Sequence, residues 1–123
     1  MKSQAYRMAM LFDFYGDMLT DRQREFYDLY YNEDLSLAEI AENYGITRQG
    51  VRDVIVRAEG ILTELEDKTG IIKRFYRMQD QFAAIQSAVD AIRRINEDRR
   101  YYDNGIEAGC NDIQHALDRL KQE

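Results

Sequence analysis

Five polar side chains between residues 47 and 57 have the types and spacing needed to contact a nucleic acid. Arg48 and Arg52 are four residues apart, so on a helix they share one face. Each guanidinium can reach a phosphate or the O6 and N7 atoms of guanine, and Gln49 suits adenine or a phosphate. Thr47 can offer its hydroxyl or amide to the backbone, and Arg57, farther along, would at most touch a phosphate. These residues therefore form the predicted nucleic-acid contact.

A helix-turn-helix would present these side chains to a groove. Its first helix needs a small residue where the second passes closest, and its turn needs a residue that tolerates positive φ. Ala41 and Gly45 meet these needs, Ile46 follows as an apolar plug, and Val51 and Val54 would be buried against the first helix. The predicted core of the motif is Leu37, Ile40, Ala41, Gly45, Ile46, Val51 and Val54. The alternative is a tight helical corner that serves as a scaffold or a protein contact, because such a corner needs the same residues.

The charge distribution bears on this choice. The net charge of −6 argues against nucleic-acid binding by the whole surface. From Thr20 to Ile46, seven acidic residues stand against two arginines, a local balance of −5, whereas from Thr47 to Arg57 the balance is +2. Asp53 lies on the candidate face and would repel phosphate. The sign of the charge thus changes where the second helix of the motif begins.

The elements that position this face are predicted to be helices, because the 123 residues include no proline and the apolar spacing is helical. We expect an all-α fold, with winged-helix-like character. One helix should run from Ser3 to Tyr15, and a second should start at the Thr20–Gln23 capping box. A third should begin at Leu37 after the Ser36–Glu39 capping box and end at Gly45, and a fourth should run from the Thr47 cap to Thr69, before Gly70.

The first two helices have predicted buried faces. On the first helix and just beyond it the buried residues should be Met8, Leu11, Tyr15 and Met18. On the second they should be Phe26, Leu29 and Tyr30, with Tyr27 and Tyr31 on its flank.

The C-terminal part carries a seven-residue apolar repeat. The repeat consists of Phe75, Met78, Phe82, Ile85, Val89 and Ile92, and after a turn at residues 103–105 it resumes as Ile106, Cys110, Ile113, Leu117 and Leu120. These stripes predict either an antiparallel hairpin of a long and a shorter helix within one chain, or pairing between two chains as a homodimer. We expect a helix-turn-helix domain at 1–70 and a helical extension at 71–123.

A second basic patch could lie near the end of the long helix, formed by Arg93, Arg94, Arg99 and Arg100. Positive charge there favours the helix dipole, which is the simpler explanation. The alternative is a second contact with RNA or with an acidic partner.

Residues 20–70, "LTDRQREFYDLYYNEDLSLAEIAENYGITRQGVRDVIVRAEGILTELEDKTG", resemble the bacterial YlxM proteins, helix-turn-helix proteins related to the DNA-reading fourth region of sigma factors. The preceding "YRMAMLFDFYGDML" resembles the family's N-terminal helix, so the likeness covers about Tyr6 to Phe82. YlxM genes lie beside genes for the signal recognition particle GTPase and its receptor. The resemblance therefore implies a role in that pathway, with the particle's RNA or GTPase as partners. Family members commonly carry Ala and Tyr where this chain has Gly50 and Arg52.

Other chemistry is not expected. Cys110 and His115 are five residues apart and would point about 140° away from each other on a helix, so they do not form a metal site. There is no glycine-rich phosphate loop, and the carboxylates fall on solvated helix faces. We expect a non-catalytic protein without metal or cofactor. No signal peptide or membrane-inserted segment is apparent, which predicts a cytoplasmic location.

Overall fold

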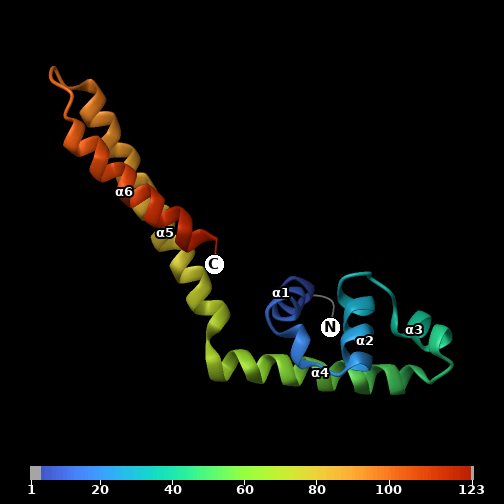
Figure 1. The fold of residues 1–123 in the computed structure, drawn as a ribbon. Coiled ribbons are helices and arrows are strands. Elements are labelled where there is room, and N and C mark those ends of the chain that lie inside the picture. The colour runs from blue at the N-terminus through green and yellow to red at the C-terminus, as the bar shows by residue number, and fades with distance from the viewer. Residues whose placement is uncertain (1–3, 123) are drawn as a thin grey trace. The chain divides into compact units, whose positions relative to one another are not determined.

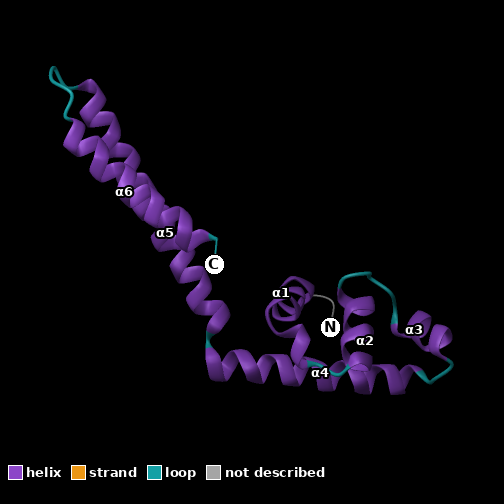
Figure 2. Ribbon diagram, in the orientation of Figure 1, coloured by secondary structure: helices purple, strands orange, loops and turns teal. Residues whose placement is uncertain are grey.

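A computed structural model describes residues 4–122, and over these residues the protein consists of helices without strands (Figures 1 and 2). The elements are α1 (Ala5–Tyr15), the 3-10 turn η2 (Gly16–Met18), α2 (Asp21–Tyr31), α3 (Leu37–Tyr44), α4 (Arg48–Thr69), α5 (Ile71–Asp98) and α6 (Asn104–Lys121). The all-α prediction is confirmed. The winged-helix-like expectation is wrong, because the described residues include no β-hairpin that could form a wing. None of the described helices combines the length and the apolar character needed to cross a membrane.

The helices begin and end at local signals in the sequence. At the start of α2, the Thr20 hydroxyl accepts from the Gln23 amide and the Gln23 side chain accepts from the Thr20 amide, at 3.3 and 3.0 Å. Ser36 and Glu39 form the same reciprocal box at the start of α3, at 3.1 and 3.2 Å. Gly70 follows α4 with φ +61°. These predicted caps are confirmed, and they satisfy backbone groups that a helix end leaves without partners.

The chain divides into two compact units, the first ending at Ile72 and the second beginning at Lys73. In the first unit, α1, α2 and α3 all pack against α4 (Figure 1). The buried row of α4 consists of Val51, Ile55, Ala58 and Leu62, none of which reaches solvent. The four residues recur every three or four positions, so one stripe of α4 faces the other three helices while its opposite face stays free.

One predicted core residue lies at the surface. Met18 is 67% exposed, and Leu19 is buried in its place. The prediction extended the spacing of α1 beyond Tyr15, but α1 ends there and the 3-10 turn follows. A 3-10 turn has a different angular step from an α-helix, so the side chains after Tyr15 no longer follow the earlier phase. The predicted start at Ser3 lies outside the described residues.

Tyr27 and Tyr31 on α2 are buried, whereas Leu29 is half-buried, so the prediction that the two tyrosines lie on the flank is wrong. Each phenol has a partner for its hydroxyl inside the unit. Tyr27 donates to the Met8 carbonyl at 2.6 Å, and Tyr31 donates to the Glu59 carboxylate. A buried tyrosine is stable when its O–H is paired, and the sequence of α2 alone does not show these partners.

The first unit should lose stability at alkaline pH. Burial raises the pKa of both Tyr27 and Tyr31 above the ordinary 10.0, and the Glu59 carboxylate raises both further. Below pH 10 both phenols are neutral in the folded and in the unfolded chain, so the stability that the two tyrosines contribute to the first unit is fully present. It is lost as pH rises above 10, by up to about 1.4 kcal/mol per pH unit for each tyrosine. Urea unfolding at pH 9 and pH 11 measures this loss, and a double Tyr27→Phe, Tyr31→Phe chain should show less of it.

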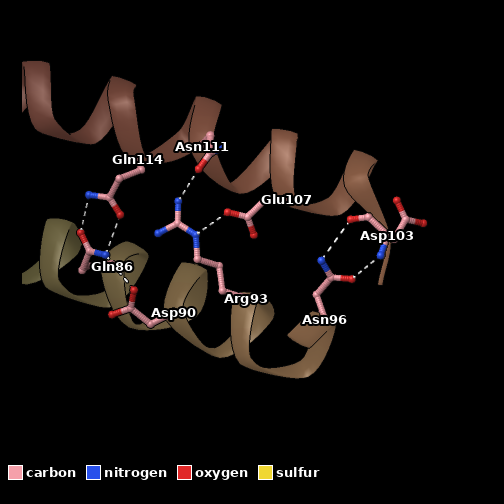
Figure 3. Close-up of polar contacts among 8 residues, drawn as sticks. All are labelled: Gln86, Asp90, Arg93, Asn96, Asp103, Glu107, Asn111 and Gln114. Carbon is pink, nitrogen blue, oxygen red and sulfur yellow. Dashed lines mark hydrogen bonds and ion pairs between the residues drawn. The ribbon is translucent and has the colours of Figure 1, made fainter. Parts of the chain in front are cut away.

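The second unit is an antiparallel hairpin of α5 and α6 within the chain. The buried side chains along it are Phe82, Val89, Asn96, Cys110 and Leu117. Between them, Gln86 and Gln114 exchange hydrogen bonds of 2.7 and 2.8 Å, and the Arg93 Nη2 atom donates to Asn111 at 2.9 Å (Figure 3). The apolar repeat therefore does not form a single buried stripe. Of its other members, Ile106 is half-buried and six are exposed, because polar residues complete the seam; the six are Phe75, Met78, Ile85, Ile92, Ile113 and Leu120.

Asn96 joins the two helices of the hairpin at its turn. Its side-chain amide donates to the Asp103 carbonyl and its oxygen accepts from the Asp103 amide, both at 3.0 Å (Figure 3). The Asp103 carboxylate in turn accepts from the Gly105 and Ile106 amides at the start of α6. The fully buried Asn96 side chain thus holds the residue that caps the next helix.

We expect Asn96→Leu to destabilise the hairpin by about 2 kcal/mol or more, because it leaves two partly buried backbone groups unpaired. Hydrogen exchange of the α6 amides should accelerate in this chain. Glu97→Gln, a change at the exposed neighbouring position, is the matched control and should leave exchange as in the wild type. Unchanged protection of α6 in Asn96→Leu would contradict this role.

Candidate nucleic-acid interface

α3 and α4 meet at a glycine turn. Gly45 ends α3 with φ +65°, a left-handed conformation that a residue with a Cβ adopts only with strain. The Ile46 amide donates to the Ala41 carbonyl at 3.2 Å, and Thr47 caps α4 by accepting from the Gly50 amide at 2.9 Å. These contacts fix the direction in which α4 leaves the turn.

The predicted core of the motif is close to the observed one. Ile40, Ala41 and Val51 are buried. The remaining apolar members of the predicted core, Leu37, Ile46 and Val54, are half-buried and pack against the core cluster. Ile55, rather than Val54, is fully buried beside Val51, because on a helix it lies about 40° from Val51 whereas Val54 lies about 60° away on the other side.

The opposite face of α4 is open at its start. Arg48, Gln49, Arg52, Asp53 and Arg57 are all exposed, as is Thr47. Arg48, Gln49 and Arg52 line a shallow recess together with Leu37 of α3. The structure thus brings three of the predicted contact residues to one surface, beside the first turn of α3.

Gln49 and Asp53 occupy the middle of this face and bind each other. The Gln49 Nε2 atom donates to the Asp53 carboxylate at 2.8 Å. This bond orients the glutamine along the helix and uses part of the hydrogen-bonding capacity of Asp53. Gln49 would have to exchange this partner to reach a base edge, so the two arginines are the side chains already free to bind a nucleic acid.

A second recess lies on the other flank of α4, and it contains a residue that sequence reasoning missed. Arg57 lines it together with Arg22, Asp53 and the capped start of α2. The Arg22 guanidinium lies 5.2 Å from the centroid of the Phe26 ring, which supports its side chain. Arg57 therefore has a basic neighbour from another helix. Only the packing of α2 on α4 brings the two together, so no local sequence pattern could have revealed the pair.

Several acidic residues that oppose nucleic-acid binding are occupied in local contacts. Glu25 accepts from the Tyr44 hydroxyl, and this bond raises the pKa of Tyr44. Glu39 is held in the α3 capping box, and Asp17 pairs with Arg24 at 2.9 Å. Their charges remain, but these carboxylates also have structural roles. Arg48 and Arg52 line one recess beside α4, and Arg57 lines the other together with Asp53 and with Arg22 of α2.

The predicted second basic patch is only partly available to a ligand. Arg93 turns toward α6, where its Nη2 atom binds Asn111 and its Nε atom lies 3.6 Å from the Glu107 carboxylate (Figure 3). Arg94, Arg99 and Arg100 are exposed near the turn of the hairpin, and the Arg100 guanidinium lies over the Tyr101 ring. Arg93 thus serves the hairpin rather than the surface.

Cys110 is buried and His115 is exposed, so the two do not share a site. Among residues 4–122, no group of three His, Cys, Asp or Glu side chains is placed to hold a metal ion.

Two helices that meet at a left-handed glycine, the second opening with exposed arginines, define a helix-turn-helix protein. Over residues 2–101 the sequence matches the family UPF0122, described as "Putative helix-turn-helix protein, YlxM / p13 like". The chain belongs to this family, as its resemblance to YlxM proteins predicted. A UPF0122 protein of Desulforamulus reducens is 44% identical over 85 residues, which are 69% of this chain and 73% of the relative.

Two other relatives show the same likeness. A UPF0122 protein of Thermoanaerobacter sp. is 43% identical over 91 residues, 74% of this chain and 78% of its own length. One from Bacillus thuringiensis is 39% identical over 107 residues, 87% of this chain and 97% of its own. The family model matches up to residue 101, and the likeness to the Bacillus thuringiensis protein, which covers 107 residues of the chain, extends into α6.

Proposed function

We propose that the protein binds duplex DNA as a non-catalytic regulator, with the start of α4 in the major groove. The observation that carries this proposal is the placement of Arg48 and Arg52. Both are exposed on the first turns of a helix whose opposite face is fully buried. A major groove about 12 Å wide admits such a helix, and two guanidiniums on one face can bind phosphates or guanine edges.

Arg57 and Arg22 would bind the phosphate backbone beside the groove. They lie on the flank of α4 away from Arg48 and Arg52, in the recess at the start of α2. Contacts on both flanks fix the orientation of a recognition helix, because phosphate contacts position a protein while base contacts specify the sequence. In this arrangement Gln49 is the candidate for reading adenine, once it leaves Asp53.

The acidic character of the chain limits its affinity for generic DNA. With a net charge of −6, the protein as a whole is repelled by phosphate, and only the α4 face offsets this. We therefore expect generic duplex to bind with a Kd on the order of micromolar or weaker at physiological salt.

Fluorescence anisotropy of a labelled generic duplex over a salt series tests the proposal. Three to four phosphate contacts predict a log-log slope of roughly −3, at about −0.9 per contact. Single-stranded DNA of the same sequence, which offers no major groove, should bind more weakly. No duplex binding even at low salt would contradict the proposal.

A second candidate function is an adaptor in the signal recognition particle pathway, as the YlxM resemblance implies. Asp53 in the middle of the α4 face favours it, since a carboxylate suits a basic protein surface better than a phosphate. Titration of the particle's RNA and of its GTPase, each labelled and in the same buffers, separates the candidates. Binding of the GTPase or RNA without duplex binding would support the adaptor.

A further inference from the structure

The hairpin of α5 and α6 leaves a row of large apolar side chains on its surface. Between 41% and 65% of each of six side chains is exposed, namely Met78, Ile85, Ile92, Ile95, Ile113 and Leu120. They lie in the same helices as the buried seam between α5 and α6 but at different positions of the seven-residue repeat. The buried seam consists of Phe82, Val89, Asn96, Cys110 and Leu117. A helix that carries two such rows has two faces to bury, and α6 occupies only one face of α5.

The second row follows its own regular spacing. On α5 it runs through residues 78, 81, 85, 88, 92 and 95, and on α6 through 106, 109, 113, 116 and 120, in alternating steps of three and four. We call these eleven residues the outer seam. Such alternation over three turns or more is the pattern of a helix that packs against another helix.

The outer seam lies on one side of the hairpin. Ile85 and Ile92 each follow a buried residue of α5 by three positions, and Ile113 and Leu120 do so on α6. In an antiparallel pair, positions with the same offset from the seam lie on the same flank. The contacts of Gln86 with Gln114 and of Arg93 with Asn111 set the register (Figure 3). This register brings Ile85 level with Ile113.

The opposite flank is polar. It consists of Asp90, Glu97, Asn104, Asn111 and Asp118, with Ala83 at its end. The hairpin is therefore amphipathic as a whole, with one apolar and one polar side, although each helix has already packed against the other. If the hairpin packed against nothing else, both of its flanks would face water, and charged residues would be expected on both.

The composition of the outer seam suits an identical partner, because two copies of an uncharged face do not repel each other. None of its eleven residues is charged, so it offers nothing to select an acidic or a basic partner. Ala88, Gly109 and Ala116 alternate with the large residues and allow a second helix to approach closely. A Cβ at Gly109 would meet no atom within 4 Å, so space is open there.

We propose that the outer seams of two copies of this chain pack together, forming a four-helix bundle about a two-fold axis. A two-fold interface needs a self-complementary patch. On α6 the outer seam alternates large and small residues, and on α5 the small Ala88 lies between Ile85 and Ile92. The two faces together hold on the order of 1,000 Å² of surface, which is where specific interfaces begin.

The thin core of the hairpin agrees with this. Among its described residues only Phe82, Val89, Cys110 and Leu117 are buried apolar side chains.

Sedimentation velocity over about 1 to 100 µM tests the proposal, a range set by the weak end of specific association. The wild-type chain should sediment as a dimer, and a chain with Ile85→Glu and Ile113→Glu as a monomer with unchanged helical circular dichroism. The matched control, Ala83→Glu with Ala108→Glu, places two charges away from the outer seam and should remain dimeric. A monomeric wild type, or a dimer that survives the two changes at 85 and 113, would overturn the proposal.

A charge-swap experiment keeps the test decisive if the glutamates weaken folding. A second chain carries Ile85→Lys and Ile113→Lys, and is monomeric alone. Mixing it with the glutamate chain should restore a dimer of one copy of each, because opposite charges then meet across the interface. A mixture that stays monomeric would contradict packing through this face.

Discussion

A chain with both Arg48→Ala and Arg52→Ala is expected to bind generic duplex DNA about 30-fold more weakly than the wild type at 0.15 M salt. The figure follows from two lost phosphate contacts, each contributing about 0.9 to the log-log salt slope, so that the slope should become less negative by about 1.8. Both side chains are exposed and support no buried contact, so the fold should be unchanged. Anisotropy measures the affinity, and circular dichroism confirms the helices.

The matched control removes the same charge elsewhere. Arg94→Ala with Arg99→Ala takes two exposed arginines from the second basic patch and changes the net charge equally. If binding depends on the α4 face, the control should bind duplex within about two- to threefold of the wild type, the loss that general attraction alone would cause. An equal loss in both double variants would show that only net charge matters.

Ile55→Ala is expected to destabilise the first unit by about 2–5 kcal/mol, the usual cost of removing a fully buried isoleucine. Ile55 lies on the stripe of α4 against which α1, α2 and α3 pack, so the cavity falls where the helices converge. A small domain is stable by only about 5–15 kcal/mol, so this change alone could unfold much of the population. Urea unfolding followed by circular dichroism measures the loss.

The neighbouring Val56 provides the control. Val56 is 44% exposed on the free face of α4, and Val56→Ala removes a comparable apolar group without opening a cavity. It should change the free energy of unfolding by about 0.5 kcal/mol at most. Similar losses in Ile55→Ala and Val56→Ala would mean that α4 is not held by the stripe described above.

The features predicted best from the sequence are those that depend on neighbours in the chain. The capping boxes at Thr20 and Ser36, the Thr47 cap and the left-handed glycines were each predicted and observed. A cap is satisfied within three residues and a glycine turn within one, so the sequence alone contains the needed information. The all-α class followed similarly from the spacing and the lack of proline.

The features that were missed depend on packing between distant residues. Tyr27 and Tyr31 are buried because Met8 and Glu59 accept from their hydroxyls. Arg22 joins Arg57 because α2 lies on α4. In the hairpin, the apolar periodicity could not show which row of side chains would be buried. Gln86, Arg93 and Asn96 complete the buried seam between α5 and α6 with polar contacts, which the periodicity does not predict.

For the candidate site, the sequence predicted which residues are exposed and not how they pair. Arg48 and Arg52 stand free as expected, whereas Gln49 is bound to Asp53. The pairing arises because glutamine and aspartate four residues apart on a helix are neighbours. Gln49→Ala should therefore weaken duplex binding less than Arg48→Ala or Arg52→Ala does, because Gln49 must break its hydrogen bond to Asp53 before it can contact DNA.

An NMR titration of the ¹⁵N-labelled protein with duplex DNA tests the central claim most directly, because it shows which residues meet the nucleic acid. The amides of residues 47–57 should shift first and furthest, together with the side-chain signals of Arg22, Arg48 and Arg52, while the hairpin amides stay in place. Shifts confined to the hairpin, or centred on Arg94, Arg99 and Arg100, would contradict binding by α4.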